Sequence, residues 1–272
     1  FAAFPNAYAL AFSSFYLLFM MVLCALIFRA VSIEFRSKRP WPWWRNFWDC
    51  SFALSSAGAA FIFGTMVGHM FIGLPVAASM EYTAHLVDHF TPFTVLIGFF
   101  AMSACAMHGS IFLYLKTEGD LQKRVHNWIW TTFGVFIIFY ILTTIYTLVN
   151  IPHATDNFKN HPWAWGVVVL NVLAIANIPR AIFLGKPAYA FISSCCTLAA
   201  LTFLFGVAIY PNLIVSSTDP SYSLNIYNAA SSEKTLGIML IVALLGMPFV
   251  MSYTAVVYWI FRGKVEIGKH SY

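Results

Sequence analysis

Charge is what this sequence has least of. Only 9% of its 272 residues are Asp, Glu, Lys or Arg, whereas soluble domains carry about 25%. So few charged side chains cannot coat a soluble globule of this size, which excludes an ordinary soluble enzyme or binding domain. The sequence also lacks the short stretches of alternating polar and apolar residues that are typical of membrane β-barrels.

Familiar signatures of catalysis and metal binding are missing as well. The five cysteines have no C-x-x-C spacing and fall within or at the ends of apolar runs, so we interpret them as packing residues rather than metal ligands or disulfide partners. We find no nucleophile beside a base, no phosphate-binding glycine loop, no zinc-ligand cluster and no nucleic-acid signal. The residues alone therefore predict no catalytic residues and no metal site in this chain.

Long apolar runs are abundant instead. Hydrophobic residues make up 60% of the chain, and its apolar runs are long enough to cross a hydrocarbon layer of about 30 Å as helices. Helices are favoured because backbone groups in lipid must be satisfied within the segment. We therefore predict an all-α fold, a polytopic transmembrane helical bundle that forms a single membrane domain over residues 1–272. The seven expected spans are residues 8–31, 50–74, 91–115, 127–151, 163–184, 188–214 and 235–261.

The positive charges are divided unevenly between the two ends of these spans. If the segment between the first two spans is inside, all Lys and Arg residues except Lys159 and Lys234 lie on the inner side. Such an asymmetry orients helices during insertion. It predicts that the first span begins outside and that the carboxyl terminus is cytoplasmic. Arg180, a few residues from its helix end, is then expected to extend to the inner surface.

Two local patterns add detail to the predicted bundle. The segment Trp41–Trp48 concentrates aromatic rings around Arg45, which is typical of an anchor at the level of the lipid headgroups. Gly64 and Gly68 lie on one face of the second span. That face is expected to let a neighbouring helix approach closely.

Two histidines within the spans are candidate cofactor ligands, because ionisable groups in a membrane are rare and costly. His69 and His108 lie on neighbouring helices and could in principle hold a haem iron. Their expected depths differ by about 18 Å at about 1.5 Å per residue, so one iron cannot bridge them. Each is more simply explained as a structural histidine bonded to a carbonyl or hydroxyl of a neighbouring helix.

A charged cluster is expected at the inner ends of the first two spans. Arg29 lies near the end of the first span, Asp49 begins the second, and Glu34 lies between them. One interpretation is a salt-bridged corner that fixes two helices. The other is the mouth of a proton path, in which the carboxylates accept protons from the cytoplasm, and the residues leave both open.

The segments around this corner resemble a known family. Residues Phe28–Lys38 follow the pattern F-R-x-V-x-(aromatic or aliphatic)-(acid)-(aromatic)-R-x-K, and Trp44–Asp49 follow W-R-N-x-W-D. Both patterns resemble subunit II of the cytochrome bd quinol oxidases. The similarity continues through His108–Gly109, Leu115–Leu121, Pro187–Phe191, Pro211–Ser217, Ala229–Leu236 and His270–Tyr272.

The resemblance implies a role within a larger enzyme. In that family a partner, subunit I, carries two haems b and one haem d together with the quinol site, and subunit II is haem-free. The complex oxidises quinol, takes up cytoplasmic protons and reduces oxygen to water during aerobic respiration in the bacterial plasma membrane. We therefore expect this chain to bind no cofactor alone, to contact subunit I and the lipid bilayer, and to support assembly and the access of protons and oxygen.

The family pattern is incomplete at the front. The family begins with a further helix and with motifs that would precede Phe1, so the resemblance implies eight spans in two four-helix bundles, and we expect this sequence to lack the first span. Two rival functions remain. A secondary transporter would need substrate ligands near the membrane midplane, and a membrane b-type cytochrome would use His69 or His108.

Overall fold

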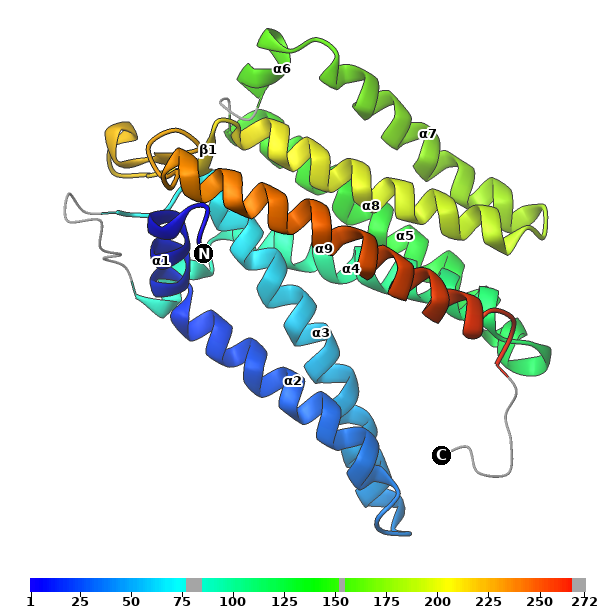
Figure 1. Ribbon diagram of the computed structural model, residues 1–272. Helices are drawn as coiled ribbons and strands as arrows, with labels where there is room; N and C mark the ends of the chain where they lie inside the picture. Colours follow the sequence, from blue (N-terminus) through cyan, green and yellow to red (C-terminus); the bar gives the residue numbers. More distant parts are fainter. Residues whose placement is uncertain (77–84, 152–154, 266–272) are drawn as a thin grey trace.

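The computed structural model describes residues 1–76, 85–151 and 155–265 (Figure 1). Within these residues, seven helices are long and apolar enough to cross a membrane, which confirms the predicted all-α membrane fold. They are α2 (Tyr16–Arg36), α3 (Pro42–Ile72), α4 (Pro92–Lys116), α5 (Gly119–Asn150), α7 (Ala164–Phe183), α8 (Pro187–Ile209) and α9 (Glu233–Ile260). The shorter elements are α1 (Pro5–Ser14), η1 (Leu86–His89), α6 (Asp156–Asn160), β1 (Asn212–Ile214), η3 (Pro220–Tyr222) and β2 (Leu224–Asn225).

The first predicted span is wrong at its beginning. Hydropathy predicts one helix from residue 8, but the structure breaks the run at Phe15, between α1 and α2. Just before the break, the Ser13 hydroxyl donates to the Leu10 carbonyl (3.0 Å), a type of local bond that competes with regular helix. Phe15 is 1% exposed, and its ring lies beside the rings of His69 and His89. Burial of Phe15 therefore accompanies a break that hydropathy does not register.

Other helix ends differ from the prediction for simple chemical reasons. α8 ends at Ile209 rather than near residue 214, because Pro211 has no backbone N–H to donate within a helix. Residues Asn212–Ile214 instead form β1, which pairs antiparallel with β2. α3 and α5 begin earlier than predicted, since both helices start in the more polar segments before their apolar runs.

The helices pack mainly as neighbours along the chain. α3 lies between α2 and α4, and α4 packs in turn against α5 and α8. α7 packs against α8, the next helix along the chain. In Figure 1 the α2–α3 pair diverges from the other helices toward the bottom of the view. We call the end with the α2–α3, α4–α5 and α7–α8 turns the turn end, and the opposite end, with α1, η1 and the β1–β2 pair, the hairpin end.

The predicted small face of α3 is confirmed in its contact with α4. A Cβ atom built on Gly64 would lie 2.6 Å from the Ala101 Cβ and 2.7 Å from the Ile97 carbonyl oxygen. One built on Gly68 would lie 2.9 Å from the Thr94 Cα. Any side chain at these positions would push the helices apart, so the two glycines set the close approach of α3 and α4.

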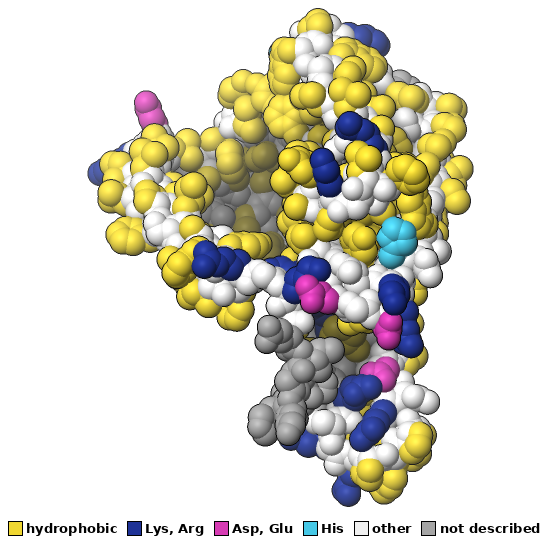
Figure 2. Space-filling view, turned by 90° about the vertical axis from the view of Figure 1, so that its right-hand side faces the viewer, with side chains coloured by type: hydrophobic (Ala, Val, Ile, Leu, Met, Phe, Trp, Pro, Cys, Tyr) yellow, Lys and Arg dark blue, Asp and Glu magenta, His cyan; other side chains and the backbone are white. Residues whose placement is uncertain are grey.

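α9 stands apart from the packed helices. None of its residues, all of which the structure describes, is buried, and Figure 2 shows it as the ridge at the left, with a hollow between it and the bundle. It is held at both ends. The Ser231 backbone N–H donates to the Ala3 carbonyl (2.8 Å), and Lys116 Nζ donates to the carbonyls of Phe261 (2.9 Å) and Gly263 (3.0 Å).

Candidate functional site

The first candidate site lies at the α2–α3 turn. Arg36, in the last turn of α2, donates from Nε to Asp49 Oδ1 (2.6 Å) and from Nη2 to Asp49 Oδ2 (3.3 Å). The sequence grouped Asp49 with Arg29, but the Arg29 guanidinium lies over the Phe52 ring, 5.6 Å from its centroid. A salt-bridged corner is therefore present, with a different arginine. Its two side chains are 48% and 51% exposed, so the carboxylate is accessible from outside the bundle.

The remaining groups of this corner are held by local contacts. Glu34, the other predicted carboxylate, pairs with Lys38 one turn along (2.9 Å). Trp44 Nε1 donates to the Phe35 carbonyl (2.8 Å), which ties the start of α3 to the end of α2. The Trp44 ring also meets the Trp48 ring edge to face, with centroids 5.6 Å apart. The aromatic segment thus closes the corner from one side.

The second candidate site lies at the hairpin end, where two histidines meet. His69 of α3 is 3% exposed, and its Nε2 lies 2.9 Å from the backbone oxygen of His89 in η1. The Thr94 hydroxyl of α4 donates to the same oxygen (2.8 Å). Because a carbonyl only accepts, Nε2 carries the ring proton of His69. Nδ1 is then an acceptor, and it has no hydrogen-bond partner among the described residues.

His89 was missed by sequence reasoning because it lies between predicted spans, where a histidine gives no signal. Its ring stands at 89° to the His69 ring, with centroids 4.9 Å apart. Burial lowers the pKa of His89 from its usual 6.5, and this outweighs a backbone hydrogen bond with Ser14 and the charge of Asp88, which both raise the pKa. A neutral His89 therefore suits this packed position, which joins η1 and the α1–α2 break to α3 and α4.

His108 has a partner of its own on α8. Its Nδ1 lies 2.9 Å from Ser194 Oγ, and the Ser194 hydroxyl donates to the Phe191 carbonyl (2.7 Å). Either His108 Nδ1 or the Ser194 hydroxyl donates in this contact, according to the tautomer of the ring. The His108 ring also stacks on Phe191, with centroids 5.1 Å apart. In the described chain the two intramembrane histidines thus bond to different elements, one to a carbonyl and one to a hydroxyl.

These positions do not fit a haem held between the two histidines or a bound metal ion. His69 lies beside the start of α4, where Thr94 shares its carbonyl partner, and His108 lies 14 residues further along the same helix. At about 1.5 Å per residue this is roughly 21 Å, so one iron cannot bridge the two rings. Among the described residues, no group of three or more His, Cys, Asp or Glu side chains could hold a metal ion. The described polar groups form hydrogen bonds and ion pairs between helices, and those at the helix ends are exposed to solvent.

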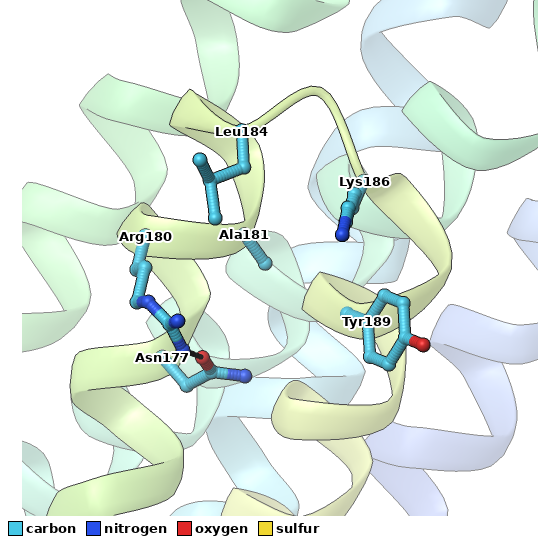
Figure 3. Close-up of a pocket in the computed structure, with 6 residues that line it drawn as sticks. All are labelled: Asn177, Arg180, Ala181, Leu184, Lys186 and Tyr189. Carbon is cyan, nitrogen blue, oxygen red and sulfur yellow. Dashed lines mark hydrogen bonds between the residues drawn. The ribbon is translucent and has the colours of Figure 1, made fainter.

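A third polar feature, not anticipated from the sequence as a site, is a hollow of about 220 Å³ between α7 and α8 at the turn end. Arg180 Nη1 donates to Asn177 Oδ1 (3.2 Å), and Asn177 Nδ2 donates to Ser193 Oγ (2.8 Å). The sequence placed Arg180 at the surface but gave no reason to combine it with Lys186. The lining residues are Asn177, Arg180, Ala181, Leu184, Lys186 and Tyr189 (Figure 3).

Comparison with known proteins identifies relatives of this chain. The sequence profile described as cytochrome bd terminal oxidase subunit II matches residues 1–261. The chain is 31% identical to the cytochrome bd ubiquinol oxidase subunit 2 of Bacillus subtilis, over 98% of this chain and 78% of that protein. It is 28% identical to the cytochrome bd-I ubiquinol oxidase subunit 2 of Escherichia coli, over 97% of this chain and 78% of that protein.

The fold also has a solved counterpart. The structure of bd oxidase from Geobacillus thermodenitrificans contains a chain that matches with a TM-score of 0.68, over 91% of this chain and 74% of that one. The two sequences are 13% identical. At this identity the likeness concerns the arrangement of helices.

Proposed function

The chain belongs to the family of cytochrome bd terminal oxidase subunit II, and on that premise we propose that it is the haem-free second subunit of a quinol:oxygen oxidoreductase. Its partner, subunit I, carries two haems b and one haem d, oxidises quinol and reduces oxygen to water. This chain supports the assembly of the complex and the access of protons and oxygen to it, in the bacterial plasma membrane.

The observation that carries this proposal is the exposure of α9, none of whose described residues is buried. Leu244 and Leu245, in the middle of the helix, are each 66% exposed, although they face nearly perpendicular directions on a helix. A membrane helix within a bundle normally packs at least one face against its neighbours. A helix that is apolar and open on successive faces, with a hollow beside it (Figure 2), supports a neighbour outside the described residues, and we assign that place to the partner subunit.

The charges support a cytoplasmic turn end. Lys264 pairs with Glu118 (3.0 Å), and this pair joins the segment after α9 to the α4–α5 turn. Arg36 and Arg180 lie at the other turns of the same end, and Lys and Arg side chains are prominent on the face shown in Figure 2. Because basic residues favour the cytoplasmic side, we propose that the carboxyl terminus is cytoplasmic.

We assign the Asp49–Arg36 corner mainly to assembly. Arg36 contacts both carboxylate oxygens of Asp49, a geometry that fixes two helices as well as balancing charge. The half-exposed carboxylate can also accept protons from the cytoplasm. Glu34 and Arg29 take a secondary part in this proposal, since Glu34 is paired on its own helix and Arg29 lies over an aromatic ring.

The two rival functions fit the described residues less well. A secondary transporter needs ligands for its substrate near the midplane, whereas the ion pairs of the described chain lie at helix ends and turns. A b-type cytochrome with two axial histidines needs both on one iron, whereas His69 and His108 are level with positions 14 residues apart along α4. Each histidine keeps one ring nitrogen outside these hydrogen bonds, so the absorption spectrum of the isolated chain tests a haem held by a single histidine.

Affinity purification of the intact subunit from its host membrane tests the proposal directly. We expect co-purification of a larger haem-bearing subunit and quinol-dependent oxygen uptake by the purified complex. Absorption spectra of the complex should show the bands of haems b and d. The isolated chain, separated from its partner, should be colourless.

Specific outcomes would contradict this assignment. A Soret band that remains with this chain after its separation from the partner would favour a b-type cytochrome. Solute uptake by proteoliposomes that contain this chain alone would favour a transporter. Purification of the intact subunit without any haem-bearing partner, under conditions that preserve membrane complexes, would overturn the subunit assignment.

A further inference from the structure

The α7–α8 turn brings two cations to opposite sides of one hollow. The Gly185 N–H donates to the Ile182 carbonyl (3.0 Å) and the Lys186 N–H to the Ala181 carbonyl (2.9 Å), which is the bonding pattern of a Schellman helix end. Gly185 has a φ of +65°, a conformation that glycine adopts without strain. The chain therefore reverses tightly, and α8 begins directly opposite the last turn of α7.

The hollow is positively charged. Figure 3 shows the Arg180 guanidinium on α7 and the Lys186 ammonium just before α8 on either side of it, with the Tyr189 ring below Lys186. No acidic residue lines the hollow, and neither cation forms a salt bridge within the described chain. The amino-terminal end of α8 adds the positive pole of its helix dipole. An anion is the complementary ligand.

A second hollow, on the surface of α7, shares Asn177 and Arg180 with the first. It has a volume of about 370 Å³ and is lined by Leu173, Ala176, Asn177 and Arg180. The lining changes from charged and polar at the turn end to apolar toward the middle of the helix. Leu173 is 59% exposed, and Leu170, one turn earlier, is 65% exposed, so the apolar track extends into the membrane-spanning part of α7.

We propose that these two hollows, which share Asn177 and Arg180, bind one anionic phospholipid, with its phosphate between Arg180 and Lys186 and an acyl chain along Leu173 and Ala176. A phosphate oxygen accepts from a guanidinium and an ammonium together, and charge-assisted bonds of this type are among the stronger hydrogen bonds in proteins. Basic pockets between membrane helices are a recurring way to hold anionic headgroups. The apolar track distinguishes a lipid from a free phosphate ion.

Native mass spectrometry of the complete complex, purified from its host membrane, tests this site. The detergent-solubilised complex is titrated with dioleoylphosphatidylglycerol and, separately, with dioleoylphosphatidylcholine. We expect the anionic lipid to bind more tightly, and the double variant Arg180→Gln/Lys186→Gln to weaken its binding about tenfold, which corresponds to the loss of charge-assisted bonds. Lys123→Gln is the matched control, because it removes a cation at the same end that pairs with Asp120.

Every result of this titration bears on the proposal. Equal affinity of the wild-type complex for the two lipids would overturn it, and so would unchanged binding in the double variant or an equal loss in the Lys123→Gln control. Displacement of the lipid by millimolar sodium phosphate would assign the site to free phosphate instead. If the double variant fails to assemble, the comparison of the two lipids on the wild-type complex decides. The readout is bound lipid, so it is independent of oxygen uptake.

Discussion

Asp49 and Arg36 show how a single residue pair joins two helices in this chain. The carboxylate receives two N–H groups of one guanidinium, at 2.6 and 3.3 Å, and this two-pronged geometry is more specific than a contact with a lysine. The two side chains are about half exposed, so solvent screening limits the contribution of this ion pair to stability. Its value lies in fixing the position of α2 relative to α3.

We predict that Asp49→Asn in the intact subunit lowers the yield of assembled complex more than the turnover of the complex that does assemble. The expected loss of stability is roughly 0.2–1 kcal/mol, because the pair is partly exposed. The measurement is haem content per subunit beside oxygen uptake per haem. Asp120→Asn is the control, since Asp120 pairs with Lys123 where both side chains are far more exposed. Normal haem content with abolished oxygen uptake would show instead that Asp49 carries protons.

His89 makes the hairpin end sensitive to acid. Its pKa is lowered in the folded chain by burial, so below its usual value of 6.5 the unfolded chain takes up a proton more readily than the folded chain. The free energy of unfolding should therefore fall as pH decreases below that value, by at most about 1.4 kcal/mol per pH unit. It should change little through this group at higher pH.

Thermal inactivation of the complex measured across pH checks this prediction. The His89→Gln variant lacks the titrating imidazole, so its stability should fall less than that of the wild type as pH decreases. His161→Gln, in another loop, is the control and should keep the wild-type slope. An unchanged slope in His89→Gln would contradict the prediction.

At the scale of elements, the contact between α3 and α4 depends on glycine. A Cβ at Gly64 meets a backbone oxygen at 2.7 Å, so the neighbouring helix must move. Gly64→Ala should lower stability by about 1–3 kcal/mol, the usual cost of overpacking. Gly58→Ala is the matched control on the same helix, because nothing lies within 4 Å of its Cβ position. It should be neutral or slightly stabilising, since alanine favours helix. Equal melting temperatures of the two variants would contradict this account.

The end of α9 is a second element whose position depends on a single side chain. Lys116 Nζ donates to two carbonyls just beyond α9, and cations favour the carbonyl end of a helix. Lys116→Met should therefore speed hydrogen exchange in residues 261–265 while the α4–α5 turn stays protected. Lys123→Met leaves both carbonyls bonded to Lys116, so it should not change the exchange in these residues. Unaltered exchange in the Lys116 variant would mean that the backbone bond from Val265 to Lys116 (2.9 Å) is sufficient.

At the scale of the whole molecule, the exposed α9 predicts a partner surface. Single tryptophan substitutions at Ala243, Leu244, Leu245 and Gly246 sample every face of one helical turn. We expect those on the face toward subunit I to reduce recovery of the partner severalfold, and those on the opposite face to be tolerated. Ile145→Trp is the control, because this residue is 55% exposed on α5 and belongs to none of the sites described above. Full recovery of the partner with all four α9 variants would contradict a subunit interface on this helix.

The partners of individual charged groups could not be predicted from the sequence. Arg29 and Arg36 are seven residues apart and share one face of α2, separated by about 10 Å along its axis. Spacing alone does not say which of them is level with Asp49. The length and path of the α2–α3 turn decide that Arg36 is, because the start of α3 returns beside the end of α2.

The number and approximate location of the membrane helices were determined by the sequence itself. Their length and hydropathy suffice for this, since lipid requires each span to satisfy its own backbone hydrogen bonds. The glycine face of α3 could also be predicted from the sequence, because the lack of a side chain allows any neighbouring helix to approach closely. The positive charges at one end of the spans also predict an orientation in the membrane.

Only the tertiary structure decided which groups far apart in the sequence come together. The break at Phe15, the meeting of His69 with His89 and the two hollows beside Arg180 all depend on how helices lie against one another. The absence of buried residues in α9 is equally invisible in its sequence, because its hydropathy is that of any membrane span. Apolar composition makes a helix enter lipid, but whether it then faces lipid, its own bundle or a second subunit is a property of packing.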